Sequence, residues 1–479
     1  MFKSTIARLE RKFIKRKLAG STADQLLKMG EKYLLPAFRR AAARSPAYRT
    51  LLKEAGVDPA TIGSVAEFKA RCPLLEKNNT FKRFDIAHLM CDDVAPGDLA
   101  SVLTSSGHGS GGFALGMSTR KQHHGSSRLI DIGLEMAFDI DACRTLLINC
   151  LPMGVMFNSD AVCVANVSVR EDMACAIVKQ AGSLFEQIIL VGDPLFYKRF
   201  CDYSQAQGVD WSRFRVNAII GEETFPEAFR NYLAGVLKVD LDDPAAGLIG
   251  SSMGVGELGL NLFSESRETV ALRRACVRNP ALLKRLTGVD SAQAPVPTFM
   301  TFNPLRTIIE VVNADSDGVG DLVVTVTDET TPVPLMRYNT GDRMQLLDAS
   351  AFNAVADMLP QGWTPPRAPM VALHGRAKDR LPGGGHVDLF KETLYSVPEL
   401  AAPLTGAHRI RAEDNHVRWE VQAIRGQMEL DQIASRLQSM LAPRLKHANV
   451  EVAVMGYDEF PHGKTIDYER KFVYWVPPA

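Results

Sequence analysis

Residues 334–342 read Pro334-Leu335-Met336-Arg337-Tyr338-Asn339-Thr340-Gly341-Asp342, an apolar start followed by a Thr-Gly turn and an aspartate. An aspartate after such a turn at a strand end can accept two hydrogen bonds from a ribose diol through one carboxylate. A turn aspartate can equally cap its own backbone, which is the more common role. The stretch therefore becomes specific only together with other motifs of the chain.

A Ser/Thr/Gly-rich loop lies far upstream, at Thr104-Ser105-Ser106-Gly107-His108-Gly109-Ser110-Gly111-Gly112. It follows an apolar segment that ends at Val102-Leu103, and a helix is expected to begin near Thr119. Glycines let backbone N–H groups turn toward an anion, and hydroxyls add donors. The loop suggests a phosphate cradle, although plain linkers have the same composition. It is not a Walker loop, because no Gly-Lys-Ser/Thr ends it.

Three further segments follow in order along the chain. Gly221-Glu222-Glu223-Thr224-Phe225-Pro226 comes after an apolar strand and opens a helix. Met253-Gly254-Val255-Gly256-Glu257 is rich in glycine, and its single acid could hold a magnesium ion. Gly375-Arg376-Ala377-Lys378-Asp379 precedes a compact C-terminal unit. Together with 334–342, these segments resemble the ANL superfamily of adenylate-forming enzymes, and most closely its phenylacetate–CoA ligase branch.

The resemblance runs over nearly the whole chain. It begins at Ser45-Pro46-Ala47-Tyr48-Arg49 and Ala55-Gly56-Val57-Asp58, which are similar to the helical leader of that branch. Residues 334–342 are its most specific element, close to the family pattern PLxRYxTGD. The resemblance implies an α/β fold, with a large AMP-binding domain of sheets flanked by helices at 1–376 and a small mobile α+β domain at 377–479.

The pattern of apolar residues agrees with this organisation. Residues 1–56 have helical periodicity and form a leader that ends near residue 60. Between 101 and 260, short apolar runs such as 145–150, 187–191 and 216–220 alternate with helical stretches such as 122–137 and 226–237, which predicts βα units around a largely parallel sheet. The alternating segments 307–313 and 321–327 predict a hairpin. The small domain is expected to have strands at 417–424 and 450–454 and a helix at 430–441.

Composition excludes several classes of protein. Basic and acidic residues number 55 each, so no net field favours nucleic acid. The eight cysteines form no CxxC pair, which fits a reducing cytoplasm and argues against a zinc site. No stretch approaches the roughly 20 apolar residues of a membrane span. The basic N-terminal segment predicts an amphipathic helix that touches a membrane surface or an acidic carrier protein, or a solvated helix packed on its own domain.

The resemblance assigns roles to residues around a nucleotide. Asp342 would hold the ribose hydroxyls, Arg376 would approach ribose or phosphate, and Glu257 would be the Mg²⁺ ligand. Gly221, Glu222 and Glu223 would line the adenine and sugar side. Met253 and Gly254 would also line the nucleotide, although Met253 stands where the family has an aromatic residue. The ATP phosphates would be wrapped by Thr104, Ser105, Ser106, Gly107, His108 and Ser110.

The resemblance also implies a hinge and a catalytic lysine in the C-terminal part. Lys378 falls at the hinge position of the family. The lysine that bridges the acyl carboxylate and the α-phosphate would be Lys464, after Pro461-His462-Gly463, with Lys471 as the competing choice. Candidates for an apolar pocket that binds the acid are Met153, Gly154, Met156, Phe157, Ser251 and Ser252, although Met153, Met156 and Phe157 could equally be core residues.

The function implied is that of an ATP-dependent acyl- or aryl-CoA ligase. A carboxylate attacks the α-phosphorus of Mg-ATP, giving an acyl-adenylate and pyrophosphate, and the thiol of coenzyme A then displaces AMP. A second hypothesis keeps adenylation but passes the acyl group to an amine or an acyl carrier protein. An acyl-enzyme route, as in the acyl-protein synthetases that the chain loosely resembles, would favour a cysteine in the small domain, but the last one is Cys276. A third hypothesis is a degenerate member that only binds a nucleotide or acyl ligand. Relatives are often homodimers.

Overall fold

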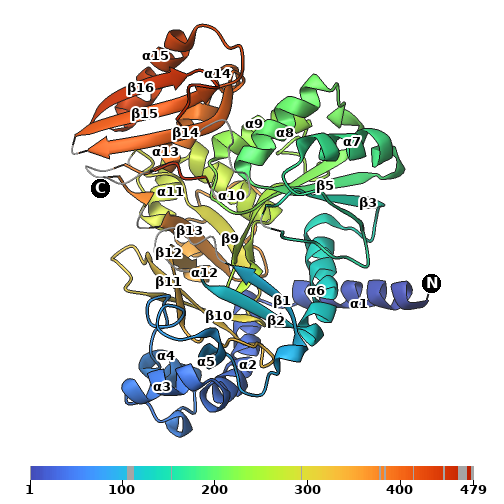
Figure 1. The fold of residues 1–479 in the computed structure, drawn as a ribbon, viewed down its shortest axis with the longest axis vertical. Helices are drawn as coiled ribbons and strands as arrows, with labels where there is room; N and C mark the ends of the chain where they lie inside the picture. Colours follow the sequence, from blue (N-terminus) through green and yellow to red (C-terminus); the bar gives the residue numbers. More distant parts are fainter. Residues whose placement is uncertain are drawn as a thin grey trace.

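A computed structural model of the chain describes residues 2–104, 113–152, 154–292, 294–376, 379–381, 385–413, 415–445, 448–461 and 472–475, without the side chains of residues 2–4, 124 and 260. The molecule is elongated, with a helical leader at one end and a small sheet domain at the other (Figure 1). Among the described residues, no helix is long and apolar enough to cross a membrane.

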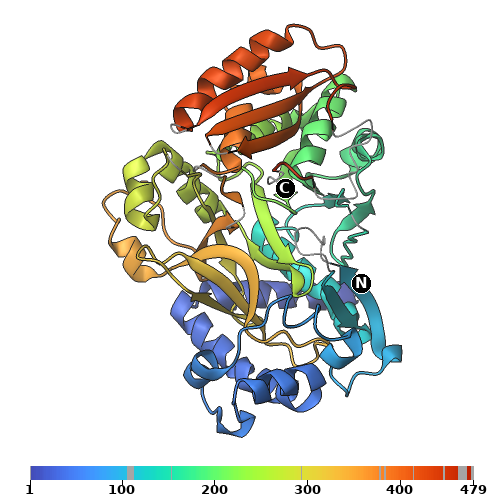
Figure 2. The same cartoon turned by 60° about the vertical axis from the view of Figure 1, so that its left-hand side comes forward.

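Most helices of the leader pack against the far end of the central sheet (Figure 2), while its first helix packs on the helix Arg120–Phe138. Ser45 caps the third helix by accepting a hydrogen bond from the Tyr48 N–H, and Tyr48 itself is buried against Phe38. Helices therefore occupy most of the segment 1–56 for which helical periodicity was predicted. The helices of the leader are α1 (Phe2–Ala19), α2 (Ala23–Arg44), α3 (Pro46–Glu54), α4 (Val65–Arg71) and α5 (Ile86–Leu89).

Eleven described strands form one large sheet in the order β10-β11-β12-β13-β9-β8-β7-β6-β5-β3-β4. The strands from β3 to β7 pair in parallel, as predicted for residues 101–260, and every residue of β3 and β5 is buried. The strands of this half are β3 (Thr145–Asn149), β4 (Cys163–Asn166), β5 (Gln187–Gly192), β6 (Arg215–Ile220) and β7 (Ile249–Val255). Its helices are α6 (Arg120–Phe138), α7 (Glu171–Ala181), α8 (Pro194–Ala206) and α9 (Glu227–Leu237).

The other half of the sheet is antiparallel. The predicted hairpin is present, with Thr307 opposite Val326. The strands are β8 (Gly259–Ser264), β9 (Thr298–Phe302), β10 (Thr307–Val312), β11 (Gly320–Val326), β12 (Tyr338–Leu347) and β13 (Met370–Arg376). The helices are α10 (Arg267–Arg278), α11 (Pro280–Thr287) and α12 (Ala349–Asn353). The Thr-Gly-Asp turn of the opening motif lies inside β12, where Gly341 has a φ of 80°.

The Ser/Thr/Gly-rich loop joins two strands, β1 (Leu99–Thr104) and β2 (Leu115–Thr119), that form a separate antiparallel pair. The predicted helix begins directly after β2. Thr119 caps it by accepting a hydrogen bond from the Gln122 N–H, and the Gln122 side chain accepts one from the Thr119 N–H in return. The short strand β2 was not predicted, because Leu115–Thr119 has no clear alternation.

The C-terminal part has a three-stranded sheet of its own, as predicted for a small α+β domain. Its strands are β14 (Leu404–Glu413), β15 (His416–Ala423) and β16 (Asn449–Met455), and its helices are α13 (Asp388–Tyr395), α14 (Pro398–Ala401) and α15 (Leu430–Leu441). The small sheet sits over α8 and α9 of the large part (Figure 1). The Tyr395 ring of α13 packs against Phe229 and Tyr232 of α9, with centroids 4.7 Å and 5.5 Å apart. The boundary at 376/377 stays a prediction.

Candidate functional site

A cluster of polar side chains lies at the ends of β7 and β13 and in the first half of β12. Asp342 and Arg376 are directly opposite each other on β12 and β13. The Arg376 Nε donates to Asp342 Oδ1 over 3.0 Å. The other carboxylate oxygen, Asp342 Oδ2, is buried and has no hydrogen-bond partner among the described residues. An unpaired buried acceptor costs free energy unless a ligand satisfies it, so this oxygen is available for a donor from outside the protein.

Glu257 is joined to the opening motif by a buried hydrogen bond. The Tyr338 hydroxyl donates to Glu257 Oε1 over 2.7 Å. Burial, together with the negative charge of Glu257, raises the pKa of Tyr338 well above its ordinary range, so Tyr338 stays a donor. The Lys77 Nζ lies 3.7 Å from the same glutamate oxygen. Glu257, the residue predicted for Mg²⁺, is therefore a neighbour of two groups, Tyr338 and Lys77, to which the sequence motifs assigned no role.

The charge of Asp342 raises the pKa of Arg376, and the more distant charges of Asp379 and Glu257 act in the same direction. Arg376 is therefore a permanent cation at this edge of the sheet. Asp379 also accepts a hydrogen bond from the Arg376 backbone N–H over 3.1 Å. The segment that begins the C-terminal unit is thus anchored at the site through both the backbone and the side chain of Arg376.

The hairpin that carries the Ser/Thr/Gly-rich loop touches the Glu257 segment. A Cβ at Gly116 of β2 would come within 2.1 Å of the Gly256 carbonyl oxygen, so the two backbones are in direct contact only because position 116 has no side chain. Thr104, the last residue of β1, is exposed at the base of the loop. The remaining predicted loop residues Ser105, Ser106, Gly107, His108 and Ser110 lie outside the described residues.

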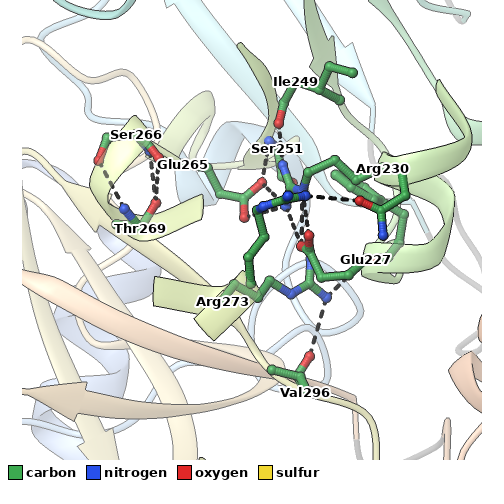
Figure 3. A network of polar contacts seen from close by, with 12 residues as sticks. Glu227, Arg230, Ile249, Ser251, Glu265, Ser266, Thr269, Arg273 and Val296 are labelled. Atoms are coloured by element: carbon green, nitrogen blue, oxygen red, sulfur yellow. Dashed lines mark hydrogen bonds and ion pairs between the residues drawn. The ribbon is translucent and has the colours of Figure 1, made fainter. Parts of the chain in front are cut away.

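A buried charged network holds β7 in place behind the site (Figure 3). Arg230 is fully buried and donates to the carboxylates of Glu227 and Glu265 and to the Ile249 carbonyl. Glu265 also accepts a hydrogen bond from the Ser251 N–H over 2.7 Å. Because every partner of Arg230 is satisfied, the network fixes the start of the strand that leads to Met253, Gly254 and Glu257.

The strand-end segment 221–224 contacts the small domain. Lys391 of α13 is buried, forms an ion pair with Glu223 and donates to the Thr224 carbonyl over 3.3 Å. The Tyr474 hydroxyl donates to the second Glu223 oxygen over 3.1 Å. Burial acts to lower the pKa of Lys391, but the charges of Glu223 and Asp388 outweigh it and raise the pKa. Glu222 next to it has a φ of 69°, a left-handed conformation that costs free energy in a residue other than glycine.

Asp193 lies close to this contact and has an unusual environment. It caps α8 by accepting a hydrogen bond from the Phe196 N–H over 3.0 Å. Burial raises its pKa to about 6, and the charges of Glu223 and Glu222 add to the effect. No sequence motif marks this residue, because its environment is created by segments that are distant along the chain.

One pocket lies near part of the segment that was predicted to bind the acid. A pocket of about 660 Å³ opens beside α6 and β4, and it is lined by His123, Ser127, Phe157, Asn158, Ser159, Asp160, Val162, Val164 and Asn166. Of the predicted lining residues that the structure describes, only Phe157 contributes to it, and its walls are more polar than those expected for an acyl pocket. Met156 is 63% exposed, and the Ser252 hydroxyl donates to Asn261 over 3.3 Å. Gly154, Ser251 and Ser252 lie elsewhere, with Ser252 near Gly221 and Leu151.

Four other predicted residues, Met153, Lys378, Lys464 and Lys471, lie outside the described residues, so their roles stay predictions. The part of the chain that is described contains no group of three or more His, Cys, Asp or Glu side chains that could hold a metal ion. Glu257 is therefore a single carboxylate at the site and not a member of a larger acidic cluster of described residues.

Of the comparisons with known proteins, the one with solved structures gives matches. No protein-family model matches the chain, and no curated protein matches its sequence. Among solved structures, it is similar to 2-hydroxyisobutyryl-CoA ligase in the postadenylation state in complex with R3-HIB-AMP, with a TM-score of 0.64 and 12% identity over 95% of this chain and 89% of that one. The same ligase in the thioesterification state, with 2-HIB-AMP and CoA, gives a TM-score of 0.52 at 12% identity over 95% and 89%.

A third similar structure is the acyl acid amido synthetase AtGH3.15 in complex with 2,4-DB, with a TM-score of 0.52 and 13% identity over 97% of this chain and 94% of that one. Sequence identities this low show a similarity of fold and nothing more. The large mixed sheet, the helices on its faces and the separate C-terminal sheet are shared over nearly the full length of each chain. The chain has the fold of the adenylate-forming enzymes of the ANL superfamily.

Proposed function

We propose that the chain is an AMP-forming ligase that activates a carboxylic acid as an acyl-adenylate and passes the acyl group to the thiol of coenzyme A. The observation that carries this proposal is the Asp342 carboxylate. One of its oxygens is bound to Arg376, and the other is buried without a partner among the described residues. A ribose hydroxyl is a donor that would satisfy the free oxygen, and Arg376 would add a fixed positive charge beside the phosphates.

Magnesium fits the donors at Glu257. Mg²⁺ is usually bound through one or two carboxylates and the phosphates of the substrate, and Glu257 offers one carboxylate whose neighbours are a hydroxyl and an ammonium group. When bound, the ion would neutralise phosphate charge. Tyr338 keeps the carboxylate oriented by donating to Oε1, while Lys77 adds a further cation near the place that a polyphosphate would occupy.

In the first step, an oxygen of the substrate carboxylate would form a bond to the α-phosphorus of ATP, and the bond to the pyrophosphate oxygen would break. The residues of the chain position the two reactants and stabilise charge, and no protein nucleophile is required. Lys464, or Lys471 as the competing choice, would contact the carboxylate and the α-phosphate. In the second step, the sulfur of coenzyme A would attack the acyl carbon and AMP would leave with its electron pair.

Rotation of the small domain between the two steps is part of the proposal. The two structures of 2-hydroxyisobutyryl-CoA ligase match this chain over the same 95% of its residues, yet their TM-scores are 0.64 and 0.52. Equal coverage by one protein in two states supports a difference in domain placement as the source. The arrangement of this chain is nearer to the postadenylation state. The hinge would lie at Lys378.

A second candidate function keeps adenylation but uses an amine as the acceptor. The similarity to an acyl acid amido synthetase over 97% of this chain supports an amine acceptor. Coenzyme A remains the primary proposal, because the higher TM-score belongs to a CoA ligase. For the reaction compartment we propose the cytoplasm, in keeping with eight cysteines that are all free.

Pyrophosphate release from ATP over a panel of short, branched, aromatic and long-chain acids tests the proposal, with and without coenzyme A. Release that needs one class of acid, together with a thioester product when coenzyme A is present, is the expected result. An adenylate that forms but reacts only with an amine would favour the second candidate. No release with any acid would refute an activating ligase. Lys464→Ala and Lys471→Ala should differ, with only one of them abolishing release, while Lys284→Ala, a change of an exposed lysine, serves as the control.

A further inference from the structure

The first helix, α1, packs on the protein through its charged face. Arg11 is 7% exposed and binds both oxygens of Asp141, over 3.0 Å and 2.5 Å. Arg8 donates to the Asp141 carbonyl over 2.7 Å, and Lys15 forms ion pairs with Glu135 and Asp139. These acids lie at the end of α6 and in the turn after it. Arg8, Arg11 and Lys15 are spaced three and four residues apart, so they occupy one side of α1.

The opposite side of α1 is apolar and faces solvent. Ile6, Leu9 and Phe13 are 60%, 62% and 65% exposed, and they too are spaced three and four residues apart. A surface helix of a globular protein normally buries its apolar side and exposes its charges. Here the two sides are exchanged. Figure 1 shows α1 lying across α6 at the edge of the molecule, with its N-terminus reaching beyond it.

Exposed cations border the apolar stripe of Ile6, Leu9 and Phe13. Because successive helical residues turn by about 100°, Lys12 and Arg16 lie on one flank of the stripe and Lys17 on the other. All three are exposed, and none forms an ion pair with a described residue. The acid within this stretch, Glu10, is already paired with Arg128 of α6. The outer side of α1 therefore combines apolar side chains with unneutralised positive charge.

The apolar stripe and its flanking cations together favour one kind of binding partner over the others. A second copy of the chain would bring the flanking cations of both helices together, and like charges at close range oppose such pairing. A protein partner needs a shaped apolar groove, whereas three side chains on one straight line suit a flat boundary. A bilayer with anionic lipids supplies both an apolar layer and negative charge in one plane. With no net charge on the chain, attraction to that surface is local to α1.

We propose that α1 binds the surface of an anionic lipid bilayer, with Ile6, Leu9 and Phe13 inserted among the acyl chains and Lys12, Arg16 and Lys17 at the headgroups. The ion pairs of Arg8, Arg11 and Lys15 with α6 clamp the helix to the protein in the orientation that keeps the stripe outside. The helix lies in the plane of the interface and does not cross the bilayer, in keeping with its length of 18 residues and its many charges.

Sedimentation of the full chain with vesicles tests this inference. Vesicles of equal parts phosphatidylcholine and phosphatidylglycerol should carry the protein into the pellet, and phosphatidylcholine vesicles should not. Binding should fall as salt is raised. Replacement of Ile6, Leu9 and Phe13 together by Ser should abolish binding. The combined change Lys12→Gln, Arg16→Gln and Lys17→Gln should weaken it by about fivefold for each cation removed.

The matched control places serines at two exposed apolar residues outside α1, Leu184 and Met428, which are 62% and 75% exposed. This variant should bind vesicles like the unchanged chain. A second measurement uses Phe13→Trp, whose added fluorescence should shift to the blue with anionic vesicles only. Failure of the unchanged chain to bind anionic vesicles, or undiminished binding after loss of the stripe, would overturn the proposal. A dimer that the stripe variant converts to a monomer would overturn it in favour of a second copy.

Discussion

The ion pair between Lys391 and Glu223 allows a quantitative test of how the small domain is held. The Lys391 side chain is 8% exposed and the Glu223 side chain 22% exposed. Replacing one partner of a buried ion pair leaves the other without compensation, which typically costs about 3–5 kcal/mol when both are fully buried. Glu223 is partly solvated, so we expect Lys391→Met to lower the free energy of unfolding by about 3 kcal/mol.

The reverse change should cost less. After Glu223→Gln, the amide can still accept the Tyr474 hydrogen bond, and Lys391 keeps the Thr224 carbonyl at 3.3 Å and Asp388 at 3.9 Å. We expect a loss of about 2 kcal/mol. The double variant removes both charges and should be no less stable than Lys391→Met alone. The coupling free energy between the two sites would then be about 2 kcal/mol.

Urea unfolding gives the free energies, and hydrogen exchange of the amides in α13 reports whether the loss is local to the junction. Lys284→Met, at an exposed helical position, is the matched control and should change stability by less than about 0.5 kcal/mol. Strictly additive losses in the double variant, or a Lys391→Met protein as stable as the control, would refute the interpretation that this pair fastens the small domain.

Three further predictions concern other buried groups. Asp342→Asn should lower kcat/KM for ATP by about a hundredfold in the pyrophosphate assay, since an ionic hydrogen bond contributes about 1.5–3 kcal/mol, and unchanged kinetics would remove Asp342 from the nucleotide site. Asp193→Asn keeps the helix cap. In the unchanged chain, burial raises the pKa of Asp193 from 3.8 to about 6. The neutral carboxyl therefore stabilises the fold below pH ~4, and this contribution is lost as the pH rises through ~6. Thermal unfolding should therefore show that the free energy of unfolding of Asp193→Asn rises relative to that of the unchanged chain, by up to about 3 kcal/mol above pH ~7. A difference that does not change with pH would contradict the raised pKa. Arg230→Met should cost about 4 kcal/mol in urea unfolding, because it leaves Glu265 buried without its cation and Glu227 with Arg273 alone, whereas Arg278→Met, at an exposed ion pair, should cost less than about 1 kcal/mol, and equal losses would contradict the role of burial.

The sequence was sufficient to predict the parts of the fold that have a strong local signal. The buried parallel strands β3, β5 and β6, the hairpin of β10 and β11, and α15 all lie within a residue or two of their predicted bounds. Strand β14 was missed, because Leu404–Glu413 interleaves charged and apolar residues irregularly and is fixed by pairing with β15. Strand β2 was missed for the same reason, because it is fixed by pairing with β1.

The residues of the candidate site also differ in how well the sequence could predict them. Asp342, Arg376 and Glu257 could be proposed because each sits in a short motif whose residues are adjacent in the chain. Lys77, Lys391 and Asp193 acquire their importance from partners that are far away in sequence, and no local pattern marks them. Tyr338 lies in the opening motif, but its hydrogen bond to the distant Glu257 is not visible there. The side of α1 that faces the protein also could not be predicted. The periodicity of the helix separates a charged side from an apolar side, but it does not show that the acids around α6 bind the charged one.

The contact at Gly116 links two segments that would otherwise move independently. Because the backbones of β2 and of the Gly256–Glu257 turn touch without an intervening side chain, there is no soft layer to absorb a displacement of one against the other. A shift of Glu257 would therefore push β2 at Gly116. A displacement of either described segment would therefore be transmitted to the other through the contact at position 116.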